Sequence, residues 1–159
     1  MELHAFVWGL PLLIGIVAGS RAMMAPAAVS WAASFGWLAL GATPLAWLAH
    51  PITHWVLTVF ALGELVTDQL PSTPSRTVPV QFGARILTGA MSGAAIGAGS
   101  GGTLHVGALF GSVGAVIGTL GGRALRGRLA SAFGSDPPAA FIEDALAIGG
   151  AILIVVALR

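Results

Sequence analysis

The sequence contains no cysteine and no lysine, and only 8% of its 159 residues are charged. Without cysteine, the chain has no disulfide, no thiolate metal site and no cysteine nucleophile. Soluble domains normally carry about 25% charged residues, so this chain has too few charges to cover a water-facing surface. The residues that are present are 56% hydrophobic, with a mean hydropathy of +0.91. This composition indicates an integral membrane protein.

The few basic residues also exclude a class of partner. All seven are arginine and the net charge is +1, so we expect no nucleic-acid partner. The N-terminal apolar segment could be mistaken for a secretory signal, but a signal needs a basic n-region. This segment carries Glu2 and His4 instead, and we interpret it as a retained first span.

Six apolar segments come close to the ~20 residues that a bilayer-spanning helix needs. The segment that begins at residue 22 is the weakest, because it contains Pro26, two serines and Gly36, and it could be short or re-entrant. The six predicted segments cover residues 5–20, 22–40, 51–70, 80–99, 104–121 and 138–157. The prediction is a single all-α transmembrane domain over 1–159, with six spans or with five and one re-entrant segment.

The arginines predict the orientation of this bundle. In a six-span arrangement, six of the seven fall in or beside connections on one face, and only Arg159 lies on the other. The residues from 123 to 138 are expected to form the most arginine-rich loop. Because basic residues concentrate on the cytoplasmic side, we expect this face to be cytoplasmic and the protein to lie in a bacterial inner membrane.

Four carboxylates stand out because the chain has only six acidic residues. Glu64 and Asp68 are four residues apart and therefore share one helix face. Glu143 and Asp144 open the last predicted span at a similar depth. A charge inside a bilayer costs about 2.5–3.5 kcal/mol, so such groups pair or face water. The prediction is a cluster of these four carboxylates with the nearest arginines, Arg21, Arg76 and Arg85.

Three interpretations of this cluster remain open. Carboxylates in excess over arginines would bind a proton or hard cation, as in a small transporter or channel-like protein. Alternatively, the charges form ion pairs that hold together a structural or assembly subunit. In the third interpretation the arginines bind an anionic lipid headgroup, with Arg76, Ser75 and Thr77 as the anion contacts.

Glycine recurs at every fourth position in two predicted spans. Small residues at this spacing let two helix backbones approach closely, either within one chain or between copies. The pattern therefore predicts close packing and would also serve a homo-oligomer. The residues concerned are Gly89, Gly93 and Gly97 in one span and Gly107, Gly111 and Gly118 in the next.

The histidines provide weak candidates for a metal site. His50 and His54 are four residues apart, a spacing at which two imidazoles on a helix can meet one metal, and His105 could join them. The alternative is that they are scattered interfacial residues. No GxSxG or HExxH motif is present, and Ser20 and Asp144 assemble no triad. We therefore expect no enzymatic activity and no cofactor.

Three stretches resemble one known family. GELVTDQLPSTPSR is similar to its E-x-x-x-D-[KQ]-[IL]-P segment, FIEDALAIGGAI to its acidic pair opening the last helix, and GSRAMMAPAAVSWAA to its G-x-R helix start. The family is the bacterial membrane-protein group called domain of unknown function 4126. The resemblance implies a small polytopic membrane protein and supplies no activity. Its signature positions here are Gly19, Arg21, Glu64, Asp68, Pro71, Arg85, Glu143 and Asp144.

Overall fold

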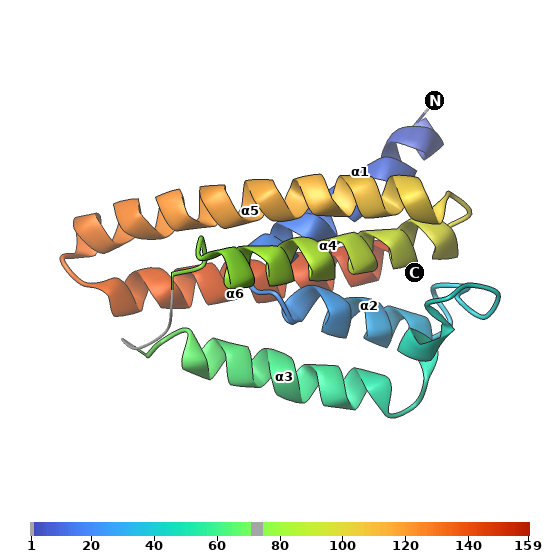
Figure 1. The fold of residues 1–159 in the computed structure, drawn as a ribbon, viewed down its shortest axis with the longest axis horizontal. Coiled ribbons are helices and arrows are strands. Elements are labelled where there is room, and N and C mark those ends of the chain that lie inside the picture. Colours follow the sequence, from blue (N-terminus) through green and yellow to red (C-terminus); the bar gives the residue numbers. More distant parts are fainter. Residues whose placement is uncertain (1, 71–74) are drawn as a thin grey trace.

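A computed structural model describes residues 2–70 and 75–159, with side chains from residue 8 onward in these ranges. The side chains of Glu2 and His4, and Pro71, lie outside the described residues. The described residues form α-helices, one short 3-10 helix (η1) and no strand, which confirms the all-α prediction (Figure 1). The helices are α1 (Glu2–Ser20), α2 (Met24–Ser34), η1 (Ala46–Ala49), α3 (Thr53–Thr67), α4 (Pro79–Gly99), α5 (Leu104–Phe133) and α6 (Asp136–Ala157).

Helix α5 packs against α1 and α4 through glycines. A Cβ atom placed on Gly111 would collide with the backbone oxygen of Gly89 in α4, and one placed on Gly93 would collide with that of Gly107. On the other side, a Cβ atom on Gly15 of α1 would collide with the backbone oxygen of Gly111. The missing side chains therefore allow three helices to meet backbone to backbone.

The regularly spaced glycines contact neighbouring helices of the same chain. They are buried between helices of one chain, so their close contacts are made within the chain. The homo-oligomer expected through these residues stays a prediction. The glycines concerned are Gly89, Gly93, Gly97, Gly107, Gly111 and Gly118.

Helix α5 is longer than predicted. The expected span ended at residue 121 and was followed by a loop, but the helix continues to Phe133 and the next one begins at Asp136. The prediction of a loop over 123–138 is wrong because alanine, leucine and arginine, which fill this stretch, all favour helix. The helix ends at Gly134, whose φ of 69° lies in the left-handed region, where glycine is the usual helix terminator.

Helix α2 is shorter than predicted. The expected span over 22–40 is helical only from Met24 to Ser34, and Gly36 follows with a φ of 78°. Eleven residues rise about 17 Å, whereas the hydrocarbon core of a bilayer is about 30 Å thick. This helix therefore cannot cross a membrane alone, and its length agrees with the re-entrant alternative.

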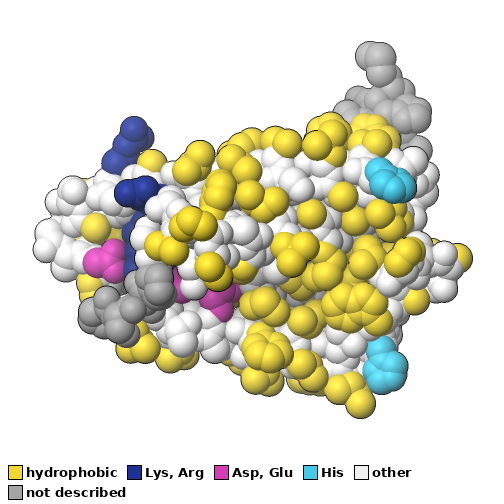
Figure 2. Space-filling view, in the orientation of Figure 1, with side chains coloured by type: hydrophobic (Ala, Val, Ile, Leu, Met, Phe, Trp, Pro, Cys, Tyr) yellow, Lys and Arg dark blue, Asp and Glu magenta, His cyan; other side chains and the backbone are white. Residues whose placement is uncertain are grey.

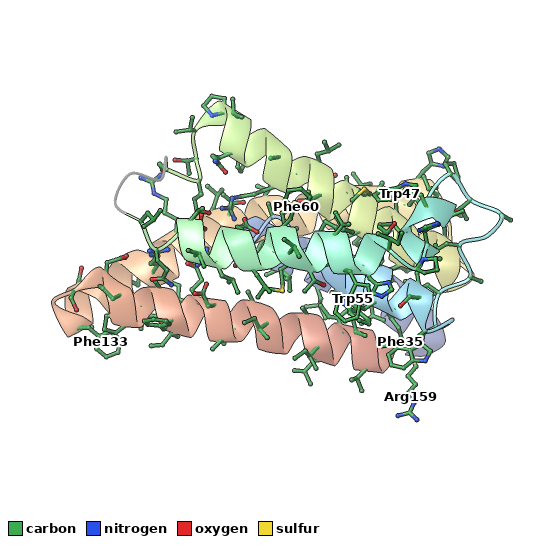
Figure 3. The ribbon with its side chains drawn as sticks, turned by 90° about the horizontal axis from the view of Figure 1, so that it is seen from below. Phe35, Trp47, Trp55, Phe60, Phe133 and Arg159 are labelled. Atoms are coloured by element: carbon green, nitrogen blue, oxygen red, sulfur yellow. The ribbon has the colours of Figure 1, made fainter. Side chains whose placement is uncertain are left out.

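The surface separates charged groups from apolar ones. On the face drawn in Figure 2, arginine and acidic side chains lie towards one end and histidines towards the other, with apolar side chains between them. Figure 3 shows Phe133, at the α5–α6 turn, and Arg159 at opposite ends. Two helices in the described part of the chain, α5 and α6, are long and apolar enough to cross a membrane. The fold is therefore consistent with membrane association.

Candidate functional site

The site is built around the break between α1 and α2. Three residues separate these helices, and the break exposes backbone groups that have no partner within either helix. Glu64 of α3 accepts hydrogen bonds from the backbone N–H groups of Ala22 (2.7 Å) and Met23 (2.8 Å). A carboxylate is favourable at this position because the start of a helix carries partial positive charge.

Arg85 of α4 performs the opposite role at the end of α1. Its Nη1 donates to the carbonyl oxygens of Gly19 (3.0 Å) and Ser20 (2.6 Å), which are among the last carbonyls of that helix. A guanidinium is favourable here because the end of a helix carries partial negative charge. The Nη2 atom of Arg85 also lies 3.6 Å from Asp68 Oδ2 and 3.8 Å from Glu64 Oε1, so both helix ends and α3 are joined.

Arg21 lies within the break itself and is the centre of the site. Its side chain is 0% exposed. Its Nη1 donates to Oδ2 of Asp68, the residue that follows α3 (2.6 Å), and its Nε donates to Asp144 Oδ1 of α6 (2.7 Å). Its Nη2 also forms an ion pair with Asp144 and lies 3.6 Å from Glu143 Oε2. One buried guanidinium therefore connects three segments that are far apart in the sequence.

Two further arginines close the side of the site that faces the α5–α6 turn. Arg76 donates through both terminal nitrogens to the two carboxylate oxygens of Glu143. Arg126 of α5 donates to both oxygens of Asp136 (2.9 and 2.6 Å) and lies 3.5 Å from Glu143 Oε2. Arg126 was not among the predicted residues, because it falls in the stretch that the sequence analysis treats as loop.

The ion pairs of the site carry one negative charge in excess. Five carboxylates, including that of Asp136 beside Arg126, face four guanidinium groups. The proton or cation interpretation invokes such an excess, and Asp136, the fifth carboxylate, is 56% exposed. The glutamate of the α6 pair is only 3% exposed. The eight residues, called the arginine–carboxylate cluster below, are Glu64, Asp68, Glu143 and Asp144 with Arg21, Arg76, Arg85 and Arg126.

The arrangement of ligands in the described residues does not favour a metal ion. No group of three or more histidine or acidic side chains in this part of the chain could hold one. His50 precedes α3 instead of lying within it, so the helical spacing assumed for it and His54 is wrong. His54 is buried with its ring 4.1 Å from that of Trp31, while His50 and His105 are exposed at other points.

The predicted anion contacts lie at the edge of the cluster. The hydroxyl groups of Ser75 and Thr77 are 3.0 Å apart, and Thr77 also accepts from Arg123 Nη1 at 3.3 Å. The guanidinium of Arg76, which was expected to bind the anion with them, is engaged by Glu143. Arg76 is therefore not free to bind an anion with these hydroxyl groups, and the arginine that contacts Thr77 is Arg123.

An apolar groove runs beside the cluster. It has a volume of about 350 Å³ and lies among α2, α3 and α6, with Trp31 and Phe35 towards one end. Leu65 and Ile148 line it, and each is within about one turn of Asp68 or Asp144. The lining of this groove is almost wholly apolar, with the hydroxyl of Thr58 among its side chains, and it is poorly suited to a hydrated ion.

Residues 9–157 match the family described as Domain of unknown function (DUF4126). The chain belongs to this family. The DUF4126 match includes every residue of the arginine–carboxylate cluster, so the cluster lies wholly within the family's domain. No curated protein and no solved structure matches the chain. Because the description of DUF4126 gives no activity, a function has to be inferred from the site.

Proposed function

We propose that the protein is a small integral membrane protein whose arginine–carboxylate cluster locks its helices together near the cytoplasmic face. The observation that carries this proposal is the full burial of Arg21 between carboxylates of α3 and α6. A buried cation among carboxylates of different helices joins these helices, because separating them leaves charges unpaired in a medium that solvates them poorly. The lock holds a broken helix, α1 to α2, at the centre of the bundle.

Membrane placement is supported by the surface. Large apolar side chains are exposed on every long helix, and among the most exposed are Val59, Val80, Leu87 and Leu153. Such side chains over most of a surface indicate contact with lipid. Arginines lie towards one end of the face drawn in Figure 2, as expected for a cytoplasmic face. Arg159, Trp47 and Trp55 lie towards the other end (Figure 3).

Transport of a proton or cation is the second candidate function. The observation that favours it is the broken helix, since discontinuous helices in membranes usually line a binding site or a cavity. The helix ends that would serve such a site are occupied, however, by Glu64 and Arg85. These occupied helix ends and the apolar groove support the lock over transport.

Asp68→Asn separates the two functions. The lock predicts a loss of about 3–5 kcal/mol in the free energy of unfolding, because Arg21 and Arg85 remain buried with less opposing charge. Transport predicts that the variant stays equally stable and loses proton- or cation-driven flux. The measurements are the unfolding midpoint in detergent micelles and ion flux in liposomes containing the wild-type protein or the variant.

Asp136→Asn is the matched control, because this carboxylate is 56% exposed and its ion pair is expected to contribute little. We expect its midpoint to stay close to that of the wild type. A wild-type flux well above that of empty liposomes, abolished in Asp68→Asn at unchanged stability, would contradict the lock and establish transport.

A further inference from the structure

Two arginines of α5 are not used by the cluster. Arg123 and Arg128 flank a shallow hollow on the outer side of this helix, whose floor consists of the small residues Ala124, Gly127 and Ser131. A Cβ atom placed on Gly127 would meet nothing within 4 Å, so the floor is open. The hollow therefore offers space between two cationic side chains.

The charges of these two arginines are uncompensated. Among the described residues, neither Arg123 nor Arg128 lies within ion-pair distance of a carboxylate, and the one hydrogen bond from Arg123 goes to the neutral hydroxyl of Thr77. Arg126, between them in sequence, is by contrast fully engaged by Asp136. The hollow therefore carries two positive charges and complements an anion.

An apolar stripe leads along α5 to this hollow. Leu109, Val113, Ile117 and Leu120 are all exposed, and their spacing of three or four residues places them on one side of the helix. Leu120 is also the first residue of the hollow. A ligand that followed this surface would have a long apolar part on the stripe and an anionic group at the arginines.

We propose that this surface binds an anionic phospholipid, with its phosphate between Arg123 and Arg128 and an acyl chain along the stripe. Guanidinium groups suit phosphate because their donors match its oxygens in pairs. The proposal rests on the membrane placement proposed above, in which this part of α5 emerges at the arginine-bearing face. It assigns headgroup recognition to α5 instead of to Arg21, Arg76 and Arg85.

Lipid binding to the intact protein in detergent tests this site. The probes are phosphatidylglycerol, which is anionic, and phosphatidylcholine, which is zwitterionic, each titrated and counted as adducts by native mass spectrometry. A basic residue near an anionic surface strengthens binding about five-fold. Arg123→Gln with Arg128→Gln is therefore expected to weaken phosphatidylglycerol binding about 25-fold and to leave phosphatidylcholine binding unchanged.

Arg159→Gln is the matched control, because this arginine lies at the opposite end of the molecule from Phe133 and the α5–α6 turn (Figure 3). Its loss should not change the binding of either lipid. An equal unfolding midpoint for the double variant shows that the fold is kept. Undiminished phosphatidylglycerol binding by the double variant overturns the proposal. Displacement of phosphatidylglycerol from the wild-type protein by millimolar inorganic phosphate also overturns it, because it would indicate a free-phosphate site. The membrane placement is tested separately, by phase partitioning in detergent. Wild-type protein that partitions into the aqueous phase would contradict it.

Discussion

Replacing Arg21 with methionine is expected to lower the free energy of unfolding by about 3–5 kcal/mol, because it leaves buried carboxylates without their cation. Asp68 and Asp144 each lose a hydrogen bond of 2.7 Å or less, and no other guanidinium lies within ion-pair distance of Asp144 in the described residues. Methionine keeps most of the side-chain volume, so the change tests charge more than packing. The measurement is the unfolding midpoint in detergent micelles.

Neutralising the carboxylates left unpaired by Arg21→Met should restore much of the lost free energy of unfolding. In Arg21→Met with Asp68→Asn and Asp144→Asn, no carboxylate is left unpaired at the centre, and neutral replacements of buried ion pairs are often tolerated. We expect the triple variant to be more stable than the single one, with Arg128→Met, an exposed arginine of α5, as the control. A single variant as stable as the wild type would show that Arg21 does not hold the helices together.

Gly111→Leu is expected to lower the free energy of unfolding for a reason unrelated to charge. A Cβ atom at this position would collide with the backbone of Gly89 and would lie 3.1 Å from Cα of Gly93. Overpacking a close contact costs about 1–3 kcal/mol and sometimes more, and here both helices would have to separate along their length. Unfolding midpoints of Gly111→Ala and Gly111→Leu should fall in that order below the wild type.

Gly121, in the same helix, is the matched control for this series. An added Cβ there meets nothing within 4 Å, and alanine is favoured over glycine in a helix by up to about 1 kcal/mol. We therefore expect Gly121→Ala to be neutral or stabilising. Equal losses for Gly121→Ala and Gly111→Ala would show that the α4–α5 contact is not limited by glycine.

The cluster could largely be predicted because charges are scarce in this chain. Its four carboxylates occur in or beside apolar segments, where an unpaired charge would be unfavourable in lipid. The chain has few arginines, so the nearest partners could be named. The structure brings together Arg21, Glu64, Asp68, Arg85, Glu143 and Asp144, as expected for the cluster. Which carboxylate meets which arginine, and which ones instead satisfy helix ends, depends on backbone directions that residue spacing does not specify.

Helix lengths were harder to predict, and two errors have one cause. Hydropathy detects apolar runs, whereas helices follow backbone hydrogen bonding and local propensity. Arg126 was therefore missed, because α5 continues as a helix past its apolar part. The length of the helix in the 22–40 segment was overestimated, because apolar residues continue beyond Ser34, where the helix ends. The helical spacing assumed for His50 and His54 was wrong for a similar reason, since His50 precedes a helix that begins only at Thr53.

In the proposed membrane placement, the pairing of Arg21 bears on how the protein enters the bilayer. Its partners Asp68 and Asp144 follow it by 47 and 123 residues, so a ribosome makes the cation long before the second anion. Until then, an unpaired charge in lipid carries a penalty of about 2.5–3.5 kcal/mol. The first helices should therefore remain at the translocation machinery or the bilayer surface, and settle to their final depth only when α6 has been synthesised.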